Sequence, residues 1–281
     1  MQLTDGRETD RRRKMTSFDT FTTDERMKDI HDKIIVWIKN FFKDKNGPAV
    51  IGISGGKDST ICAALLAEAL GPENVIGVQM PNGEQADISD SDKVIESLGI
   101  GKIVINIKGM YNDLTSRLGD WYGGDELPKL YTTNTPARLR MTTLYGIAAI
   151  YGGLVCNTCN KSEDYVGYST KYGDAAGDFS LLNRLTKTEV VALGDYMKLP
   201  NELVHKTPSD GMCGKSDEDN MGFTYEALDT FILTGLPPKS EEVFRKIVTM
   251  HHNPNTKYKL IEMPSALEEF IPDAFDRVAE F

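Results

Sequence analysis

One loop of the chain has the residue types needed to bind phosphate. Residues 50–53 read Val-Ile-Gly-Ile, and Ser-Gly-Gly-Lys-Asp-Ser follows directly at 54–59. The apolar run 61–70 comes next, so the segment is typical of a strand, a small-residue loop and a helix N-terminus. Helix N-termini carry unpaired N–H groups and partial positive charge, and glycine allows close approach of an anion. The segment therefore predicts a phosphate-binding loop.

The spacing of this loop differs from the Walker A and Rossmann patterns. Asp58 follows Lys57 where a Walker A loop needs Ser or Thr, and Gly52, Gly55 and Gly56 do not form Gly-x-Gly-x-x-Gly. An ordinary glycine-rich turn has little use for a carboxylate, whereas Asp58 is suited to bind Mg²⁺. The loop instead resembles the pyrophosphate-binding loop of the N-type ATP pyrophosphatases, which cleave ATP between its α- and β-phosphates.

A second polar segment follows a predicted strand at 154–156. It spans 157–163 and ends in Glu163. Because the carboxyl ends of parallel strands meet at one sheet edge, we expect Asp58 and Glu163 to share Mg²⁺. The alternative for Glu163 is a first-turn helix carboxylate favoured by the helix dipole.

The pattern of apolar residues predicts an α/β fold. Expected strands lie at 75–80, 102–106 and 154–156, and expected helices at 24–43, 86–98, 136–151, 224–233 and 241–251. A helix followed by a long loop is expected over 108–135. This order predicts a doubly wound parallel sheet with helices on both faces. We expect a single domain over 21–281 after a flexible N-terminal segment at 1–20, whose basic cluster is alternatively a targeting signal.

The charge and hydropathy of the chain restrict the kinds of partner that it could bind. The formal net charge of −10 disfavours nucleic acid as the main partner. No apolar run approaches the ~20 residues that span a bilayer, so a cytoplasmic protein without membrane contact is expected. Cys156 and Cys159 form a single Cys-x-x-Cys without a second pair, so we interpret them as small side chains lining a strand end, with a redox role as the alternative.

Six stretches together resemble ammonia-dependent NAD synthetase, in that family's order. They lie at 54–59, 137–141, 160–163, 170–174, 185–190 and 216–225. The first stretch alone leaves GMP synthetase and asparagine synthetase open, and Thr-Lys-Tyr-Gly-Asp at 170–174 separates them. The resemblance implies an adenine nucleotide alpha hydrolase-like fold and the amidation of deamido-NAD by ammonia. ATP would adenylate the nicotinate carboxylate, and ammonia would then displace AMP.

The resemblance also implies roles for individual residues. Catalysis would depend on Asp58, Ser59 and Lys187, and Mg²⁺ would bind Asp58 and Glu163. ATP would contact Gly52, Ile53, Ser54, Gly55, Gly56, Lys57, Asp58, Ser59, Thr158, Lys187 and Ser209. Deamido-NAD would contact Arg138, Lys171, Asp178 and Lys257. Lys57, at the variable position of the loop, is expected to point to solvent or to a distal phosphate. Asp174 is a hypothetical base for ammonium.

Two departures from the family pattern concern binding. Thr256 stands where the family usually has His beside Lys257, and Asn157 stands where it usually has Gly before Thr158. No nitrilase-like glutaminase segment precedes the synthetase, so ammonia is the expected nitrogen donor unless a partner supplies it. The family further implies a homodimer that shares the deamido-NAD site. Residues 204–222 are expected to close over the adenylate as a mobile loop.

Two other functions stay open from the residues. One is another N-type ATP pyrophosphatase that adenylates a different substrate, although thiolation of tRNA is disfavoured by the acidic charge. The other is a nucleotide-binding regulatory module without turnover, which would not need Glu163 or Lys187.

Overall fold

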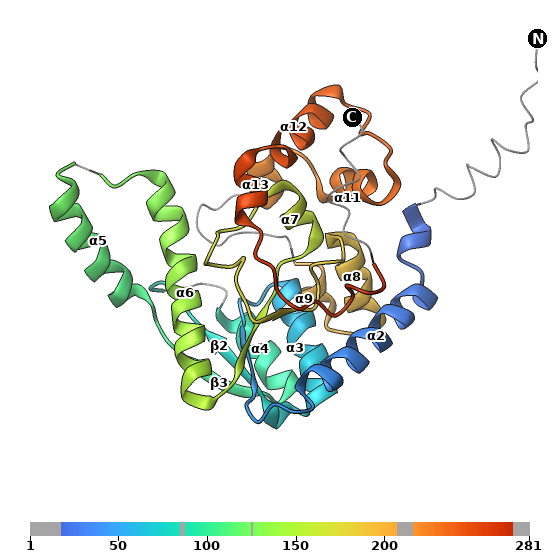
Figure 1. Cartoon of the computed structure of the whole chain (residues 1–281), viewed down its shortest axis with the longest axis horizontal. Helices are drawn as coiled ribbons and strands as arrows, with labels where there is room; N and C mark the ends of the chain where they lie inside the picture. The colour runs from blue at the N-terminus through green and yellow to red at the C-terminus, as the bar shows by residue number, and fades with distance from the viewer. Residues whose placement is uncertain (1–17, 85–87, 125, 207–215, 272–281) are drawn as a thin grey trace, which may run out of the picture.

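A five-stranded parallel sheet forms the centre of the protein (Figure 1). The computed structural model describes residues 18–84, 88–124, 126–206 and 216–271. The sheet order is β3-β2-β1-β4-β5, and the strands are β1 Ala49–Gly52, β2 Val75–Gln79, β3 Gly101–Val104, β4 Leu154–Asn157 and β5 Phe179–Ser180. From β1 the chain proceeds outward to β3, then returns to the other side of β1 for β4. The predicted doubly wound α/β fold is confirmed.

Helices connect the strands, and further helices pack on one another at one end of the molecule. They are α2 Asp24–Phe42, α3 Lys57–Leu70, α4 Ile88–Leu98, α5 Lys108–Tyr122, α6 Lys129–Tyr151, α7 Lys161–Val166, α8 Lys187–Tyr196, α9 Asn201–Val204, α10 Asp217–Met221, α11 Tyr225–Thr234, α12 Glu241–His251 and α13 Pro254–Lys259. Short 3-10 turns lie at η1 Phe18–Phe21 and η2 Pro72–Asn74. The predicted helices 24–43, 86–98, 224–233 and 241–251 are confirmed within two residues at each end.

Alternating strand residues supply the two faces of the sheet. Val50 points to the face that α6 covers, where it packs with Met141 and Leu144. Ala49 and Ile51 point to the opposite face, where they pack with α2, α3 and α8. Each fully buried aliphatic side chain of this kind contributes roughly 1.5–3 kcal/mol to folding. Burial on both faces explains why the strands read as continuous apolar runs.

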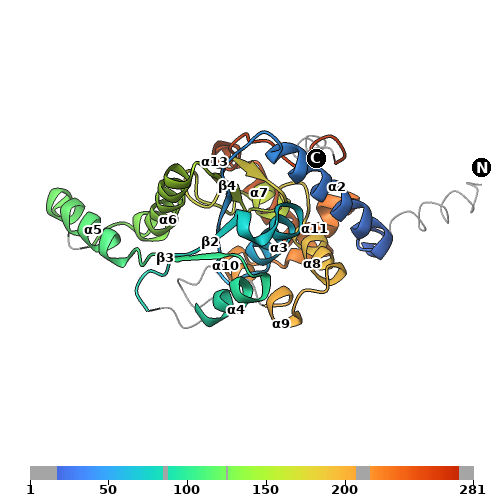
Figure 2. The ribbon, with the colours of Figure 1, turned by 90° about the horizontal axis from the view of Figure 1, so that it is seen from below.

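The α5–α6 region differs from the prediction. Helix α6 begins at Lys129 rather than at Pro136, so the connection after α5 is short. Proline is favoured in the first turn of a helix, which made Pro136 look like a start signal. In the structure Pro136 lies inside α6 and is buried. Helix α5 projects away from the sheet, whereas α6 lies against it (Figure 2).

Some sequence predictions fall beyond the described residues. They are the flexible segment at 1–20, except for its last three residues, and residues 207–215 of the predicted mobile loop at 204–222, including Ser209. Among the helices that the structure does describe, none is both long and apolar enough to cross a membrane.

Candidate active site

The loop between β1 and α3 lies at the carboxyl edge of the sheet, beside the point where the strand order reverses. Helix α3 begins at Lys57, and its N-cap Gly56 offers no side chain to its first N–H groups. Helices α2, α7, α8, α10, α11 and α12 each begin with a side-chain cap. The uncapped N-terminus of α3 therefore presents backbone donors to an anion.

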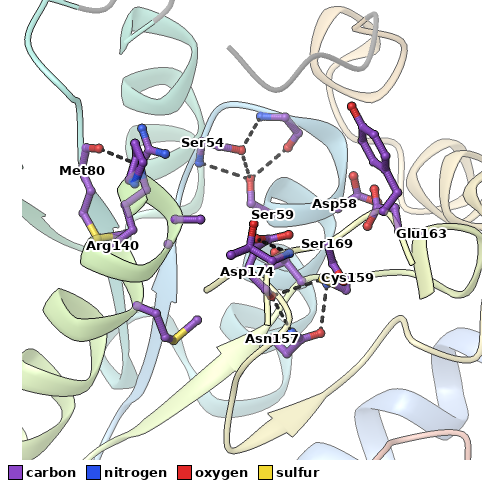
Figure 3. Close-up of a pocket in the computed structure, with 18 of the residues that line it drawn as sticks. Ser54, Asp58, Ser59, Met80, Arg140, Asn157, Cys159, Glu163, Ser169 and Asp174 are labelled. Carbon is purple, nitrogen blue, oxygen red and sulfur yellow. Dashed lines mark hydrogen bonds between the residues drawn. The ribbon is translucent and has the colours of Figure 1, made fainter. Parts of the chain in front are cut away.

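Hydrogen bonds within the loop hold it in shape (Figure 3). The backbone N–H of Gly56 donates to Ser54 Oγ at 3.2 Å, and Ser59 Oγ donates to the Gly56 carbonyl at 3.1 Å. Gly55 has a φ of 76°, and a Cβ there would lie 3.0 Å from the backbone of Ser91. Glycine is needed at this position because of both its left-handed backbone and this close approach.

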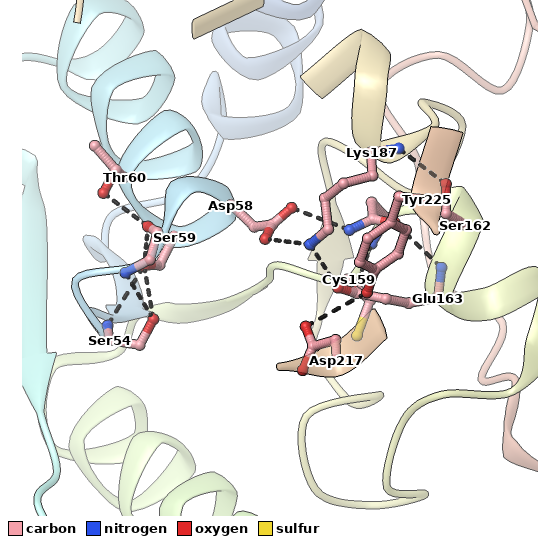
Figure 4. Close-up of polar contacts among 12 residues, drawn as sticks. Ser54, Asp58, Ser59, Thr60, Cys159, Ser162, Glu163, Lys187, Asp217 and Tyr225 are labelled. Carbon is pink, nitrogen blue, oxygen red and sulfur yellow. Dashed lines mark hydrogen bonds and ion pairs between the residues drawn. The ribbon is translucent and has the colours of Figure 1, made fainter. Parts of the chain in front are cut away.

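Three charged side chains meet beside the loop (Figure 4). Lys187 Nζ lies 2.8 Å from Asp58 Oδ2 and 2.8 Å from Glu163 Oε1. Asn160 Nδ2 donates to Asp58 Oδ1 at 3.0 Å and its own Oδ1 caps the backbone N–H of Glu163. The structure thus brings together Asp58, Glu163 and Lys187, three residues predicted from separate motifs.

Burial determines the charge state of this group. Burial raises the pKa of Glu163 to about 7, and the nearby Lys187 opposes that rise. The two carboxylates raise the pKa of Lys187 above its ordinary value although burial opposes them. Only 5% of the Lys187 side chain is exposed, so the ammonium depends on these two partners.

Asp58 and Glu163 suit a magnesium ion by their chemistry. Both are carboxylates that converge on one cation, the Lys187 ammonium. Mg²⁺ commonly takes one or two protein carboxylates and completes its shell with waters and substrate phosphates. No group of three or more His, Cys, Asp or Glu residues within the described residues could hold a metal by itself.

A cavity of about 970 Å³ opens in front of the loop and contains most of the predicted ATP site. Its lining includes Gly52, Ile53, Ser54, Gly56, Lys57, Asp58, Ser59, Thr158, Glu163 and Lys187. Lys57 is 8% exposed, so the expectation that it points to solvent is wrong. Because Lys57 lines the cavity, the other prediction for it, that it points to a distal phosphate, stays open. Cys156 and Cys159 are buried and line the same strand end, as expected.

The four residues predicted to bind deamido-NAD do not line this cavity. Arg138 Nε donates to the Lys171 carbonyl at 3.2 Å, and Lys171 Nζ lies 3.6 Å from the centre of the Tyr258 ring, next to the exposed Lys257. Asp178 instead accepts the backbone N–H of Val155 on β4 at 2.8 Å. Arg138 and Lys171 therefore form a basic surface outside the cavity, and Lys257 directly precedes Tyr258 on α13.

A family model described as NAD synthase matches residues 30–265, which is most of the chain. The chain belongs to the NAD synthase family. The NH(3)-dependent NAD(+) synthetase of Methanocaldococcus jannaschii is 38% identical over 226 residues, covering 79% of this chain and 86% of that relative. The enzyme of the same name from Carboxydothermus hydrogenoformans is 36% identical over 236 residues, covering 83% and 96%.

Solved structures of the NAD synthase family also match. An NMN synthetase from Francisella tularensis has a TM-score of 0.74 at 32% identity and covers 85% of this chain and 98% of that one. An NH3-dependent NAD synthetase from Campylobacter jejuni, in complex with the nitrate ion, has a TM-score of 0.66 at 27% identity, covering 84% and 98%. The resemblance seen in the six motifs is confirmed.

Several polar residues of this NAD synthase site were not assigned from the sequence. Asn160 binds Asp58, and Asp217 lies in the cavity wall at 3.5 Å from the Tyr225 hydroxyl. The Lys187 ammonium lies 5.0 Å from the centre of the Tyr225 ring. Asn-x-x-Glu at 160–163 is a capping-box pattern, so it could have located the start of α7. Tyr225 ends the stretch at 216–225 that contributes to the family resemblance, but the sequence does not place its ring beside Lys187.

Thr256 has a packing role in the structure. It is 3% exposed, its hydroxyl donates to the Met250 carbonyl, and it lies against Gly167, where a Cβ would come within 2.8 Å. The space at this position fits a small side chain. The exchange of the usual His for Thr therefore accompanies close packing of α13 on the turn after α7.

Proposed function

We propose that the protein catalyses the ATP-dependent amidation of deamido-NAD by ammonia, giving NAD, AMP and pyrophosphate. One observation supports this proposal above the others. The uncapped N-terminus of α3 and the side chains of Asp58, Glu163 and Lys187 all line the same cavity. Membership of the NAD synthase family supports the choice of reaction. A regulatory module without turnover would not need this costly buried charge cluster.

The loop is the proposed site of the ATP phosphates. The N–H groups of the first turn of α3 and the Ser59 hydroxyl supply donors, and Lys57 and Lys187 supply positive charge. The nicotinate carboxylate attacks the α-phosphorus, the bond to the β-phosphate oxygen breaks, and pyrophosphate leaves. Ammonia then attacks the acyl carbon and AMP leaves. No protein nucleophile is required, because the reaction depends on positioning and charge compensation.

Asp58 and Glu163 are the residues that would hold Mg²⁺. When bound, the ion compensates the negative charge that grows on the phosphates as pyrophosphate leaves. The Lys187 ammonium keeps the two carboxylates close together and contributes charge of its own. Asp174 also lines the cavity, and burial raises the pKa of its carboxyl. We propose Asp174 as the proton acceptor for ammonium.

Incubation of the purified protein with ATP, Mg²⁺, deamido-NAD and ammonium chloride tests this function. NAD and AMP should form in equal amounts. Glutamine in place of ammonium should give no NAD with the protein alone. Formation of neither product, while other carboxylates are adenylated, would favour the alternative of an N-type ATP pyrophosphatase with a different substrate.

A mononucleotide acceptor is a second candidate. The Francisella tularensis relative is described as an NMN synthetase and has the higher TM-score of the two structures compared above. Nicotinate mononucleotide carries the same reacting carboxylate as deamido-NAD but lacks the adenylate half. The ratio of kcat/KM for the two acceptors decides between them, and a ratio above one for deamido-NAD supports the main proposal.

Lys171 is expected to bind the phosphates of deamido-NAD. Replacing it with alanine should raise KM for deamido-NAD by about 10- to 100-fold, the loss typical of a charged hydrogen bond, while KM for ATP changes little. Steady-state kinetics with each substrate varied in turn measures this. Lys239→Ala removes an exposed lysine on the connection between α11 and α12 and should change neither KM.

We further propose a homodimer built on the α5–α6 hairpin. Helix α5 has no buried residue, and large apolar side chains on the hairpin are exposed, namely Met110, Leu118, Trp121, Tyr122, Leu130, Tyr145, Ile150 and Tyr151. Large apolar side chains exposed along two neighbouring helices are typical of a protein–protein interface. Arg138 lies on the same α6, so a second copy packed there would lie beside the basic surface proposed for deamido-NAD.

The double substitution Trp121→Glu and Leu130→Glu should convert the dimer to a monomer. These side chains are 83% and 74% exposed in one chain, and charges there would oppose burial against a second copy. Light scattering coupled to gel filtration gives the molar mass, and turnover should fall with it. Val36→Glu, at an exposed apolar position on α2, should keep both mass and turnover. An unchanged mass in the double variant would place the interface elsewhere.

A further inference from the structure

Asp229 on α11 is a buried carboxylate that does not line the active-site cavity. It is fully inaccessible to solvent. Burial raises the pKa of Asp229 to about 6, and hydrogen bonds from Ser162 and Thr188 oppose the rise. A buried carboxylate is costly unless it is well satisfied by donors. The identity of those donors therefore indicates what it does.

Its hydrogen bonds join two helices that carry active-site residues. Asp229 Oδ1 accepts the Ser162 hydroxyl of α7, and Oδ2 accepts the backbone N–H and the hydroxyl of Thr188 on α8, at 2.8 and 2.7 Å. Ser162 Oγ also accepts the backbone N–H of Lys187 at 2.9 Å (Figure 4). One carboxylate thus connects the start of α7 to the start of α8.

These contacts flank the charged residues of the site. Ser162 directly precedes Glu163, and Thr188 directly follows Lys187. The first backbone N–H groups of α8 have no intrahelical partners, and Ser162 and Asp229 accept two of them. The 2.8 Å contact between Lys187 Nζ and Glu163 Oε1 joins the same two helix starts on the cavity side. Asp229 and this ion pair therefore fix one relative placement of α7 and α8.

We propose that Asp229 is a positioning residue for the adenylation step. It acts through Ser162 and Thr188 and holds Glu163 and Lys187 at the spacing that charge compensation requires, so the inference rests on the proposed function. Groups that orient the residues of a site commonly affect activity almost as much as those residues themselves. An ordinary capping carboxylate would instead affect only the stability of α8.

Asp229→Asn tests the proposal, because asparagine keeps the size but replaces one acceptor oxygen with a donor. We expect kcat to fall by about 10- to 100-fold. KM for ATP should rise by a smaller factor than the fall in kcat, since most of the proposed ATP contacts come from the loop at 54–59 and the α3 N-terminus, and only Lys187 among them depends on Asp229. Ile38→Ala on α2, which removes fully buried side-chain atoms without removing any of these hydrogen bonds, is the control. It should lower the thermal midpoint and leave kcat unchanged.

A double-mutant cycle with Glu163→Gln separates positioning from a merely structural role. If Asp229 acts through Glu163, adding Asp229→Asn to Glu163→Gln should reduce kcat much less than it does in the wild type. Equal factors in the two backgrounds, or a kcat for Asp229→Asn equal to that of the control, would overturn the proposal.

Ser162→Ala provides a milder variant in case Asp229→Asn does not fold. It removes only the hydroxyl that links Asp229 to the Lys187 backbone. Its kcat should fall by a larger factor than KM for ATP rises, and a wild-type kcat would contradict the inference. Wild-type protein in the same assay distinguishes the two levels: absence of NAD formation there rejects the proposed function, whereas normal wild-type activity with unaffected variants rejects only the role of Asp229.

Discussion

Replacing Asp58 with asparagine is expected to lower turnover by about 100-fold or more, because compensation of phosphate charge by a bound metal is worth several kcal/mol. Asp58 accepts hydrogen bonds from Lys187 and Asn160, and its side chain is 20% exposed at the cavity wall. Asparagine keeps the shape of the side chain but removes the charge. Rates of AMP and NAD formation over a range of Mg²⁺ concentrations measure the loss, and the Mg²⁺ concentration for half-maximal rate should rise.

Asp195→Asn is the matched control for this change. Asp195 is also an aspartate in a helix, and it accepts a hydrogen bond from His205 at 2.8 Å, but its side chain is 51% exposed and away from the cavity. This variant should keep wild-type kinetics. Both variants should retain the wild-type circular dichroism spectrum. Full activity of Asp58→Asn would remove Asp58 from the mechanism.

Lys187→Met should reduce both activity and stability. Methionine is similar in length but has no charge, so Asp58 and Glu163 would face each other without a counter-ion. Breaking a buried ion pair by removal of one partner typically costs about 3–5 kcal/mol, and the lost charge should reduce turnover by about 100-fold or more. Urea unfolding and steady-state kinetics measure the two effects. Lys239→Met, at an exposed lysine, should change neither.

The stability loss in Lys187→Met should depend on pH in a defined direction. In the wild type the pKa of Glu163 is about 7, above its ordinary value of 4.5, and Lys187 holds it down. Without Lys187 the folded-state pKa of Glu163 rises further, so the folded state binds a proton that the unfolded state releases. Stability of the variant relative to wild type should therefore fall as pH rises through and above about 7, and be recovered toward pH 5. A difference that does not change with pH would show that Glu163 does not carry the cost.

The polar contacts of the loop itself follow from neighbouring residues. Ser54, Gly56 and Ser59 bond to one another across at most five positions, and Gly55 needs a left-handed backbone. Such short-range geometry depends on residue type and spacing, so the sequence predicts it well. The parallel pairing of the strands follows in the same way, because alternating strands and helices allow few topologies.

Contacts between residues far apart in the chain do not follow from the sequence in this way. The site depends on contacts between Lys187 and Asp58, 129 residues apart, and between Ser162 and Asp229, 67 residues apart. Periodicity assigns each residue to a helix, but it does not give the distance between two helix starts. The predicted start of α6 is wrong for a related reason, since the helix continues on the N-terminal side of Pro136, which is buried within it, although the local preference of proline is for a first turn.

The sequence by itself determined the phosphate loop, the parallel α/β architecture and, through six motifs, the family. Only the tertiary structure decided that Lys57 faces the cavity, that Lys187 joins Asp58 to Glu163, and that the residues predicted to bind deamido-NAD lie outside the ATP cavity. The physical reason is the range of the interactions involved. Turn and capping preferences act between near neighbours, whereas burial and ion pairing depend on which distant segments pack together.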